Sequence, residues 1–252
     1  MQGYGEGFAQ IYNMRWTHFA STVAPRIRTF YEATALGRQC RKLLDLACGT
    51  GQLALYFLQE GYEVVGLDLS PSMLVHAREN AAPYLQAGQV RFLEADAAEF
   101  SLDTHVGLVV STFDALNHLP DMDALEGCFE STFEALLPEG WFIFDLNTPF
   151  GLQRWGGISV QEEEDLVLIT RGVVVEEEDR AYTQISGFLR REDGLYTRFG
   201  EVAYNTIFEL GEVATLLKDI GFRRVHFANA QSLETPLEAP ETYGRVFVVV
   251  QR

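Results

Sequence analysis

Short apolar stretches alternate with longer amphipathic stretches over the first 150 residues of the chain. The apolar stretches have the length of buried strands, whereas the amphipathic stretches repeat their apolar residues at the 3.6-residue spacing of a helix. The pattern predicts strands at 42–47, 62–67, 90–94, 106–111 and 140–146, and helices at 52–60, 71–86 and 121–137. Strands that alternate with helices in this way indicate a parallel sheet with right-handed crossovers.

A different pattern follows between residues 149 and 206, where three runs are rich in β-branched and aromatic residues. Such runs favour strands, and the glycine-containing turn between the last two is typical of a hairpin. We therefore expect an antiparallel β insert that covers the carboxyl ends of the parallel strands, where open α/β sheets bind ligands. The three runs lie at 165–175, 181–190 and 195–206, and beyond them we expect a helix at 209–220 and strands at 225–230 and 245–250.

The composition is typical of one enzyme domain with an elaboration: 252 residues, of which 47% are hydrophobic and 22% are charged. No apolar run approaches the roughly 20 residues that span a bilayer, and the first residues lack the basic head and apolar centre of a secretory signal. We therefore expect a cytoplasmic protein that binds no membrane. Acidic residues outnumber basic residues by 36 to 19, and the formal charge of −17 disfavours nucleic acid as a partner.

The cysteines and the acidic runs do not predict metal or disulfide chemistry. Cys40, Cys48 and Cys128 lack the spacing of a metal site or a disulfide framework, which favours reduced thiols. The acidic runs at 162–165 and 176–179 are typical of solvated strand ends that discourage aggregation. Cation binding at these runs is the alternative, and we predict no bound metal.

The stretch from Leu43 to Gly51 reads LLDLACGTG, an apolar strand with an acid and two glycines before a helix. Glycine adopts backbone angles that other residues resist and lets a ligand approach the main chain closely. The glycines also satisfy the loose form of the dinucleotide fingerprint, so an NAD(P)-dependent oxidoreductase is one alternative. Asp45, four residues before the first glycine, would repel a phosphate and instead suits an ammonium or a sulfonium group.

The order of acid and glycines resembles motif I of the class I S-adenosylmethionine-dependent methyltransferases, and the resemblance extends over nearly the whole chain. Among these enzymes the chain is similar to the small-molecule type, such as the glycine, sarcosine and amino-sugar N-methyltransferases. The resemblance implies a doubly wound, seven-stranded Rossmann-like α/β fold, with an antiparallel β insert after the fifth strand. It also implies S-adenosyl-L-methionine as cofactor and in-line methyl transfer to a small molecule, at nitrogen or oxygen. A catalytically silent S-adenosylmethionine-binding module is the second alternative.

The resemblance also assigns the cofactor-binding residues, most of which follow the ends of the predicted strands. It implies that Asp68 accepts hydrogen bonds from the ribose hydroxyls and that Asp96 accepts one from the adenine amine. It further implies that the Ala97 N–H donates to the adenine ring and that Met73 packs on the ring edge. The complete expected set is Tyr12, Asp45, Ala47, Gly49, Gly51, Asp68, Leu69, Met73, Asp96, Ala97 and Phe113.

Aromatic residues recur at every fourth position near the start of the chain, as on one face of an amphipathic helix: Tyr4, Phe8, Tyr12 and Trp16. This stripe is either core packing or, as the resemblance implies, a lid over the cofactor whose aromatic face attracts a sulfonium. We therefore expect an N-terminal helical lid (1–40), a cofactor-binding domain (41–148 with 207–252) and a β insert that covers the substrate (149–206).

His118 is the candidate general base, because it follows the fourth predicted strand and histidine titrates near neutral pH. Asp114, Tyr4 and Glu201 are the alternatives. The segment from Tyr196 is similar to a Y-x-R-x-x-E-x-x-x-R segment of small-molecule methyltransferases. Asn205 stands where an arginine is common, which removes the anion contact that this arginine would make. The identity of the acceptor and the oligomeric state do not follow from the sequence.

Overall fold

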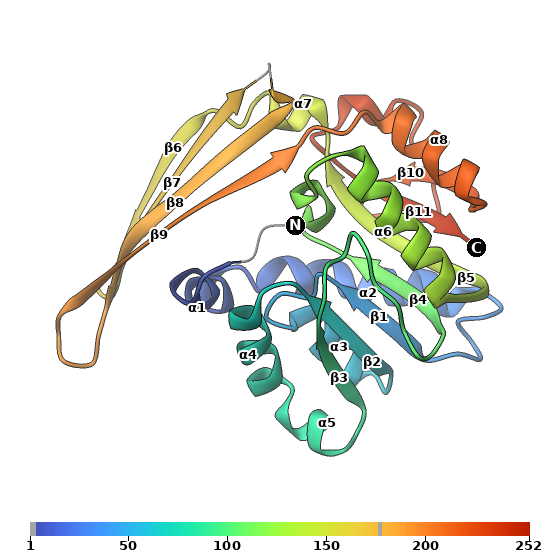
Figure 1. The fold of residues 1–252 in the computed structure, drawn as a ribbon, viewed down its shortest axis with the longest axis horizontal. Coiled ribbons are helices and arrows are strands. Elements are labelled where there is room, and N and C mark those ends of the chain that lie inside the picture. The colour runs from blue at the N-terminus through green and yellow to red at the C-terminus, as the bar shows by residue number, and fades with distance from the viewer. Residues whose placement is uncertain (1–3, 176–177) are drawn as a thin grey trace.

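A seven-stranded sheet forms the centre of the protein (Figure 1). The computed structural model describes residues 4–175 and 178–252. Its strand order is β3-β2-β1-β4-β5-β11-β10, and β11 alone runs against the direction of the other six. This arrangement confirms the predicted Rossmann-like α/β fold. The strands are β1 (Lys42–Leu46), β2 (Glu63–Asp68), β3 (Val90–Glu94), β4 (Val106–Ser111), β5 (Leu136–Asn147), β10 (Arg223–Ala228) and β11 (Arg245–Gln251).

Helices cover both faces of this sheet, and each face has its own apolar core. Neighbouring strand residues point to opposite faces, so Leu43 packs in one core and Leu44 in the other. The first core includes residues of α2 (His18–Ala33), α3 (Gln52–Gln59) and α4 (Pro71–Asn80). The second includes residues of α6 (Met122–Ala135) and α8 (Leu210–Ile220). The sheet is thus buried on both sides, as parallel sheets usually are.

A separate four-stranded antiparallel sheet extends away from the core as a long ribbon (Figure 1). Helix α1 (Glu6–Arg15) lies between this insert and the core, and a third apolar cluster joins them. In this cluster Phe8 of α1 packs with Met73 of the core and Phe199 of the insert. The strands of the insert are β6 (Gly157–Glu162), β7 (Leu166–Val175), β8 (Arg180–Arg190) and β9 (Tyr196–Thr206).

The structure corrects two of the predicted helices. The helix predicted at 71–86 is divided into α4 and α5 (Ala82–Gln86), because Pro83 cannot donate a helical hydrogen bond and opens a new helix. The helix predicted at 121–137 ends at Ala135, and β5 already begins at Leu136 instead of at 140. Strand β5 contains an irregularity near Glu139, which has a φ of 64°, so the pairing with β4 shifts there.

Two predicted strand regions also differ from the structure. Strand β6 was not predicted; its six residues are all exposed and include only two large apolar side chains, Ile158 and Val160. Strand β10 begins and ends two residues earlier than the predicted 225–230. The turn between β8 and β9 forms the expected hairpin, with Gly194 at a φ of 81° and a hydrogen bond from Arg191 N to Leu195 O. Glu176 and Glu177 of the second acidic run lie outside the described residues.

Short helical segments complete the connections. The 3-10 helix η1 (Ala115–His118) follows β4, and α7 (Pro149–Leu152) leads from β5 toward the insert. A second 3-10 helix, η3 (Pro240–Thr242), precedes β11. In the described part of the chain, no helix combines the length and apolar character needed to cross a membrane.

Candidate functional site

The turn from β1 to α3 uses backbone conformations that open it toward a ligand. Ala47, Gly49 and Gly51 have φ values of 57°, 53° and 76°, in the left-handed region. A Cβ atom on Gly51 would also lie 3.1 Å from the Cβ of Ala77 in α4, so both the space and the φ favour glycine there. At Gly49 the nearest atom beyond the turn is in the ring of Tyr12, 3.6 Å from where a Cβ would lie. The turn therefore presents its main chain to a cavity beneath Tyr12.

Asp68, at the end of β2, is 8% exposed and is held by two backbone groups. Its Oδ2 accepts a hydrogen bond from Gly49 N at 2.8 Å, and its Oδ1 accepts one from Ser70 N at 2.8 Å. Burial raises the pKa of Asp68, while these N–H donors act in the opposite direction. A carboxylate offers about four acceptor positions, so Asp68 retains capacity for hydroxyl groups in the cavity that it lines.

Asp45 lies beneath the turn instead of in the main cavity. It is 2% exposed, and its Oδ2 accepts a hydrogen bond from Ala54 N of α3 at 3.0 Å. Burial raises its pKa to about 7. Asp45 lines a small side cavity of about 30 Å³, which shares Tyr12 and Thr112 with the main cavity. A direct contact of Asp45 with the ligand, expected from the sequence, would have to be made through this side cavity.

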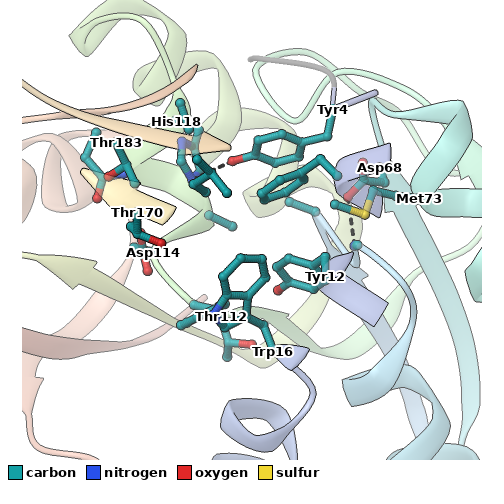
Figure 2. A pocket seen from close by; sticks show the side chains of 18 of the residues that line it. Tyr4, Tyr12, Trp16, Asp68, Met73, Thr112, Asp114, His118, Thr170 and Thr183 are labelled. Carbon is teal, nitrogen blue, oxygen red and sulfur yellow. Dashed lines mark hydrogen bonds between the residues drawn. The ribbon is translucent and has the colours of Figure 1, made fainter. Parts of the chain in front are cut away.

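The main cavity, of about 250 Å³, lies between the core, α1, η1 and the insert. Figure 2 shows Asp68 and Met73 on one side of it, and Thr170 and Thr183 of the insert on the opposite side. Aromatic rings supply much of the lining between these sides. They belong to Tyr4, Phe8, Tyr12, Trp16, Phe113 and Trp155. The cavity therefore combines an apolar lining with a small number of polar groups, as ligand sites usually do.

An arginine that lines the cavity lies between two carboxylates. Arg245, at the start of β11, pairs with Asp145 of β5, and its Nη2 lies 2.6 Å from Oδ1 of Asp114. Asp145 is fully buried and also accepts hydrogen bonds from the backbone of Phe113 and Asp114. Phe113 and Asp114 both have a positive φ. These contacts hold the left-handed backbone after β4 in place, and Arg245 has its charge matched by two carboxylates.

His118 is held in one orientation at the end of η1. Its Nδ1 lies 2.6 Å from the carbonyl oxygen of Tyr204 in β9, so Nδ1 carries the proton and donates it. Its Nε2 lies 3.1 Å from Oη of Tyr4 and accepts the hydrogen bond of that hydroxyl. Burial lowers the pKa of His118, although the nearby Asp114 acts in the opposite direction. His118 is therefore neutral at pH 7. The Tyr4 hydroxyl, which hydrogen-bonds to the lone pair of Nε2, connects this nitrogen to the cavity (Figure 2).

Buried amide groups fasten the η1 segment to the core and to the insert. Asn117 is fully buried, and its Nδ2 donates to the carbonyl oxygens of Asn147 and Thr206 at 3.2 and 3.0 Å. Its Oδ1 accepts a hydrogen bond from Asn147 N at 2.9 Å. Asn147 Nδ2 in turn donates to Oδ1 of Asn205 in β9 at 2.7 Å. These bonds connect the segment that carries His118 to the ends of β5 and β9.

Polar contacts also hold α1 over the glycine turn. Oδ1 of Asn13 accepts hydrogen bonds from Gln52 of α3, at 3.2 Å, and from Asn80 of α4, at 2.8 Å. Before α1 begins, the carbonyl oxygen of Tyr4 accepts a hydrogen bond from Oγ of Ser70 at 2.7 Å. The aromatic stripe therefore contributes to packing and to the cavity: Phe8 packs in an apolar cluster, while Tyr4 and Tyr12 also line the cavity. Its role as a lid over the cofactor stays a prediction.

The structure brings together most, but not all, of the residues that the sequence assigned to the site. The predicted residues that line the main cavity are Tyr12, Ala47, Gly49, Asp68, Met73, Phe113 and His118. Those that do not line it are Asp45, Gly51, Leu69, Asp96 and Ala97. Asp96 instead accepts a hydrogen bond from Ala98 N at 2.9 Å, and Ala97 is buried in the core. A cofactor contact at these two residues stays a prediction.

Several residues of the cavity were not predicted from the sequence. One of the three alternative bases, in turn, does not line the cavity. Asp114 and Tyr4 line the cavity, whereas Glu201 does not. The missed lining residues include Trp155, Thr170, Thr183, Ala203 and Arg245. No local motif marks them, because they come from the insert and from the start of the final strand.

The remaining titratable residues have other environments. Within residues 4–175 and 178–252, no group of three His, Cys, Asp or Glu side chains is arranged to hold a metal ion. In the first acidic run, Glu163 pairs with Arg15 of α1, and Asp165 pairs with Arg190. Burial raises the pKa of the Cys48 thiol well above its usual range, so this residue is not a reactive thiolate.

Comparisons with known proteins agree with this fold. Residues 43–140 match the model of a family described as "Methyltransferase domain". The chain is 28% identical over 250 residues to the putative methyltransferase YqeM of Bacillus subtilis (strain 168). This alignment covers 98% of this chain and 96% of the relative.

Two solved structures share the whole architecture. One is an S-adenosylmethionine-dependent methyltransferase from Clostridium acetobutylicum ATCC 824, with a TM-score of 0.81, 21% identity and coverage of 97% of each chain. The other is the sugar N-methyltransferase KedS8 from Streptoalloteichus sp. ATCC 53650, with a TM-score of 0.79 and 21% identity. The second likeness covers 100% of this chain and 95% of that chain. At these identities the structural likeness establishes the fold.

Proposed function

Because this chain is a class I S-adenosylmethionine-dependent methyltransferase of the small-molecule type, we propose that it methylates an amine nitrogen of a small molecule. The observation that carries the proposal is the neutral His118, whose Nε2 accepts the hydrogen bond of the Tyr4 hydroxyl. An amine acceptor must lose a proton, and this pair supplies a base at the cavity. An oxygen acceptor is the outcome that the experiment below distinguishes.

The cofactor of this class of enzyme is S-adenosyl-L-methionine, and we propose that it binds in the main cavity. We assign its ribose to the carboxylate of Asp68 and its adenosine portion to the space beside Met73 and the main chain of Gly49, all of which line the cavity. The aromatic ring of Tyr12 faces the same space, where a cation gains about 1 kcal/mol from an aromatic face. When bound, the cofactor supplies a methyl group that its sulfonium makes electrophilic. Leu69, Asp96 and Ala97 are retained as proposed contacts of the adenosine.

The charges around the cavity favour an amine over an anionic acceptor. Asp68 and Asp114 line it, whereas Arg245 is matched by Asp114 and Asp145. A protonated amine that enters this site is therefore attracted, and an anion is repelled. The same charges favour the positively charged cofactor.

The proton of the amine leaves through Tyr4. The amine N–H donates to Oη of Tyr4, and as this proton transfers, the Tyr4 hydroxyl proton passes to Nε2 of His118. The carboxylate of Asp114 stabilises the imidazolium that forms, because it favours the protonated form of His118. Burial raises the pKa of Tyr4 well above its usual range, so Tyr4 relays the proton and does not retain the negative charge. The amine then has a free electron pair for in-line attack.

The two elements outside the core give the cavity its cover. We propose that residues 1–40 act as a lid and residues 149–206 as a substrate cover, since α1 and the insert both line the cavity. A correctly oriented, enclosed pair of reactants can gain roughly 7 to 11 kcal/mol over reactants free in water. A cytoplasmic location stays a prediction.

Methyl transfer to matched amines and alcohols tests the amine assignment. The purified protein is incubated with S-adenosylmethionine that carries a labelled methyl group and with pairs of small amines and the corresponding alcohols, and products are identified by mass spectrometry. We expect methylated amines. Because burial lowers the pKa of His118, the rate should rise with pH, and the midpoint of this rise should lie below the ordinary histidine value of about 6.5. Transfer to the alcohols alone, or to neither class, contradicts the proposal.

A further inference from the structure

We propose that the insert wall of the cavity, formed by Asn205, Thr183 and Thr170, is a subsite for an uncharged oxygen of the acceptor molecule, such as an amide carbonyl or a hydroxyl, and that it excludes a carboxylate. The proposal rests on the proposed function in taking the ligand of this subsite to be the acceptor. It concerns the part of that molecule that does not react. It assigns a role to the segment in which Asn205 stands where an arginine is common.

Asn205 presents a hydrogen-bond donor to the cavity. It is 4% exposed, and it lines the cavity from β9. Its Oδ1 accepts the hydrogen bond from Asn147 Nδ2 at 2.7 Å, which leaves the Nδ2 edge of its amide for a ligand. Asn147 is itself fixed by its backbone bond to Asn117. The Asn205 amide is therefore held in place before a ligand binds, and a buried donor of this kind favours ligands that supply an acceptor.

Thr183 presents a second donor from the neighbouring strand. Its Oγ1 accepts a hydrogen bond from Nε1 of Trp155 at 2.5 Å, so its own hydroxyl proton points elsewhere. Thr183 lies two residues from Ala181, the partner of Asn205 in the β8–β9 pairing, so both side chains are on the same face of the insert. Thr170 adds a second hydroxyl on this wall (Figure 2).

The charges at the cavity decide between an uncharged oxygen and a carboxylate. Arg245 is the one cationic side chain among the described residues that line the cavity, and it is already paired with Asp114 and Asp145. A carboxylate on the insert wall would therefore meet no unmatched positive charge, while Asp114 would repel it. Burial of a charge without a partner costs far more than burial of a hydrogen-bonded neutral group. The donors of this wall are thus suited to an uncharged acceptor atom.

The position of the subsite also connects it to the proposed chemistry. Strand β9 carries Asn205, and its Tyr204 carbonyl accepts the proton of His118 Nδ1. One strand thus carries the donor and the carbonyl group that orients the base. A molecule with an amine and an uncharged oxygen close together in its structure would engage both.

Binding of three matched probes to the protein saturated with S-adenosylhomocysteine tests the proposal without any methyl transfer. The probes are alaninamide, alanine and isopropylamine, which carry the same amine beside an amide, a carboxylate and a methyl group. Isothermal titration calorimetry gives each affinity. We expect alaninamide to bind about tenfold or more tightly than either of the other probes.

Two variants and one control assign this preference to the insert wall. Thr183→Val removes a donor at nearly constant shape and should weaken alaninamide about 2- to 10-fold, the effect of one hydrogen bond, while leaving isopropylamine unchanged. Asn205→Arg introduces an unmatched cation and should shift the preference toward alanine. Thr197→Val makes the first substitution at an exposed position of β9 that does not line the cavity, and it should change nothing.

The outcomes separate this proposal from the amine assignment. Equal affinity for alaninamide and isopropylamine, tighter binding of alanine, no binding of any probe, or a Thr183→Val protein with unchanged affinities would each overturn the subsite. Should Asn205→Arg fail to fold, the Thr183→Val comparison still decides. If the binding preference is found but amines are not methylated, the subsite stands and the amine function fails. If amines are methylated and alanine binds as tightly as alaninamide, the amine function stands and the subsite fails.

Discussion

Two walls of the cavity are built in different ways: the proposed cofactor wall, with Gly49 and Asp68, and the proposed acceptor wall, with Tyr4 and His118. On the cofactor wall, the interacting groups are near one another in the sequence: Asp68 binds the backbone of Ser70, two residues away, and of Gly49, 19 residues away. On the acceptor wall, the contacts join distant parts of the chain: 114 residues separate Tyr4 from His118, and 86 separate His118 from Tyr204. The first wall depends on backbone turns, and the second depends on side chains that only the complete fold brings together. The two walls should therefore fail separately when they are mutated.

The largest expected effect is on turnover at the acceptor wall. His118→Ala removes the group that we propose receives the proton, and general bases contribute roughly 100- to 10,000-fold to rates. We expect kcat to fall by this order while the affinity for S-adenosylmethionine, measured by calorimetry, stays within twofold. The control is His105→Ala, since His105 is exposed and does not line the cavity. A loss of cofactor affinity in His118→Ala would show that the two walls are not independent.

The next effect is on affinity at the cofactor wall. Asp68→Ala removes the proposed acceptor for the ribose hydroxyls and leaves the N–H groups of Gly49 and Ser70 without their partner. Loss of such a buried acceptor costs about 1 to 3 kcal/mol, so we expect calorimetry to show about 5- to 150-fold weaker cofactor binding. Glu94→Ala is the matched control, because Glu94 is exposed at the end of β3 and pairs in register with Asp68. Equal weakening by both variants would mean that the general charge, and not the ribose contact, is responsible.

The same contrast explains which parts of the protein the sequence predicts. The core strands and the glycine turn were found because their signals are local, namely alternation, an acid at a strand end, and glycines before a helix. Strand β6 was missed because its short sequence has only two large apolar residues, Ile158 and Val160, both of which are exposed. Thr170 and Thr183 look like any strand residues, and only the placement of the insert over the core makes them part of the cavity. The break near Ala81 was within reach of the sequence, because Pro83 disrupts a continuous helix.

Asp45 belongs to the motif recognised in the sequence, but it lies beneath the turn and does not line the main cavity. Its pKa is raised to about 7 by burial, so the folded protein binds its proton more tightly than the unfolded chain does. The resulting stability is present below the unfolded pKa near 4 and is lost as pH rises toward 7. We expect the free energy of unfolding to contain a contribution that falls by up to about 1.4 kcal/mol per pH unit between pH 4 and 7. In Asp45→Asn this contribution should be absent, which urea unfolding at pH 5, 6, 7 and 8 measures.

The control for this pH dependence is Asp103→Asn. Asp103 is exposed and pairs with Arg91 on the surface, so its replacement should leave most of the slope in place. A wild-type slope unchanged in Asp45→Asn would show that Asp45 does not titrate in this range. Loss of the pH dependence in Asp45→Asn would show that Asp45 supports the turn from β1 to α3, outside the main cavity.

The smallest expected effect tests whether α1 acts on the cofactor through charge or through packing alone. The ring of Tyr12 lies 3.6 Å from where a Cβ of Gly49 would be, and both residues line the cavity. If it contacts the sulfonium, it should stabilise S-adenosylmethionine, which is charged at sulfur, and not S-adenosylhomocysteine, which is neutral there. Tyr12→Leu should therefore weaken the first by about fivefold relative to the second, the equivalent of about 1 kcal/mol. Tyr12→Phe keeps the aromatic face and should keep the ratio of the two affinities. Equal weakening of both ligands by Tyr12→Leu would assign Tyr12 to packing, and α1 would then contribute to the cofactor wall only by enclosing it.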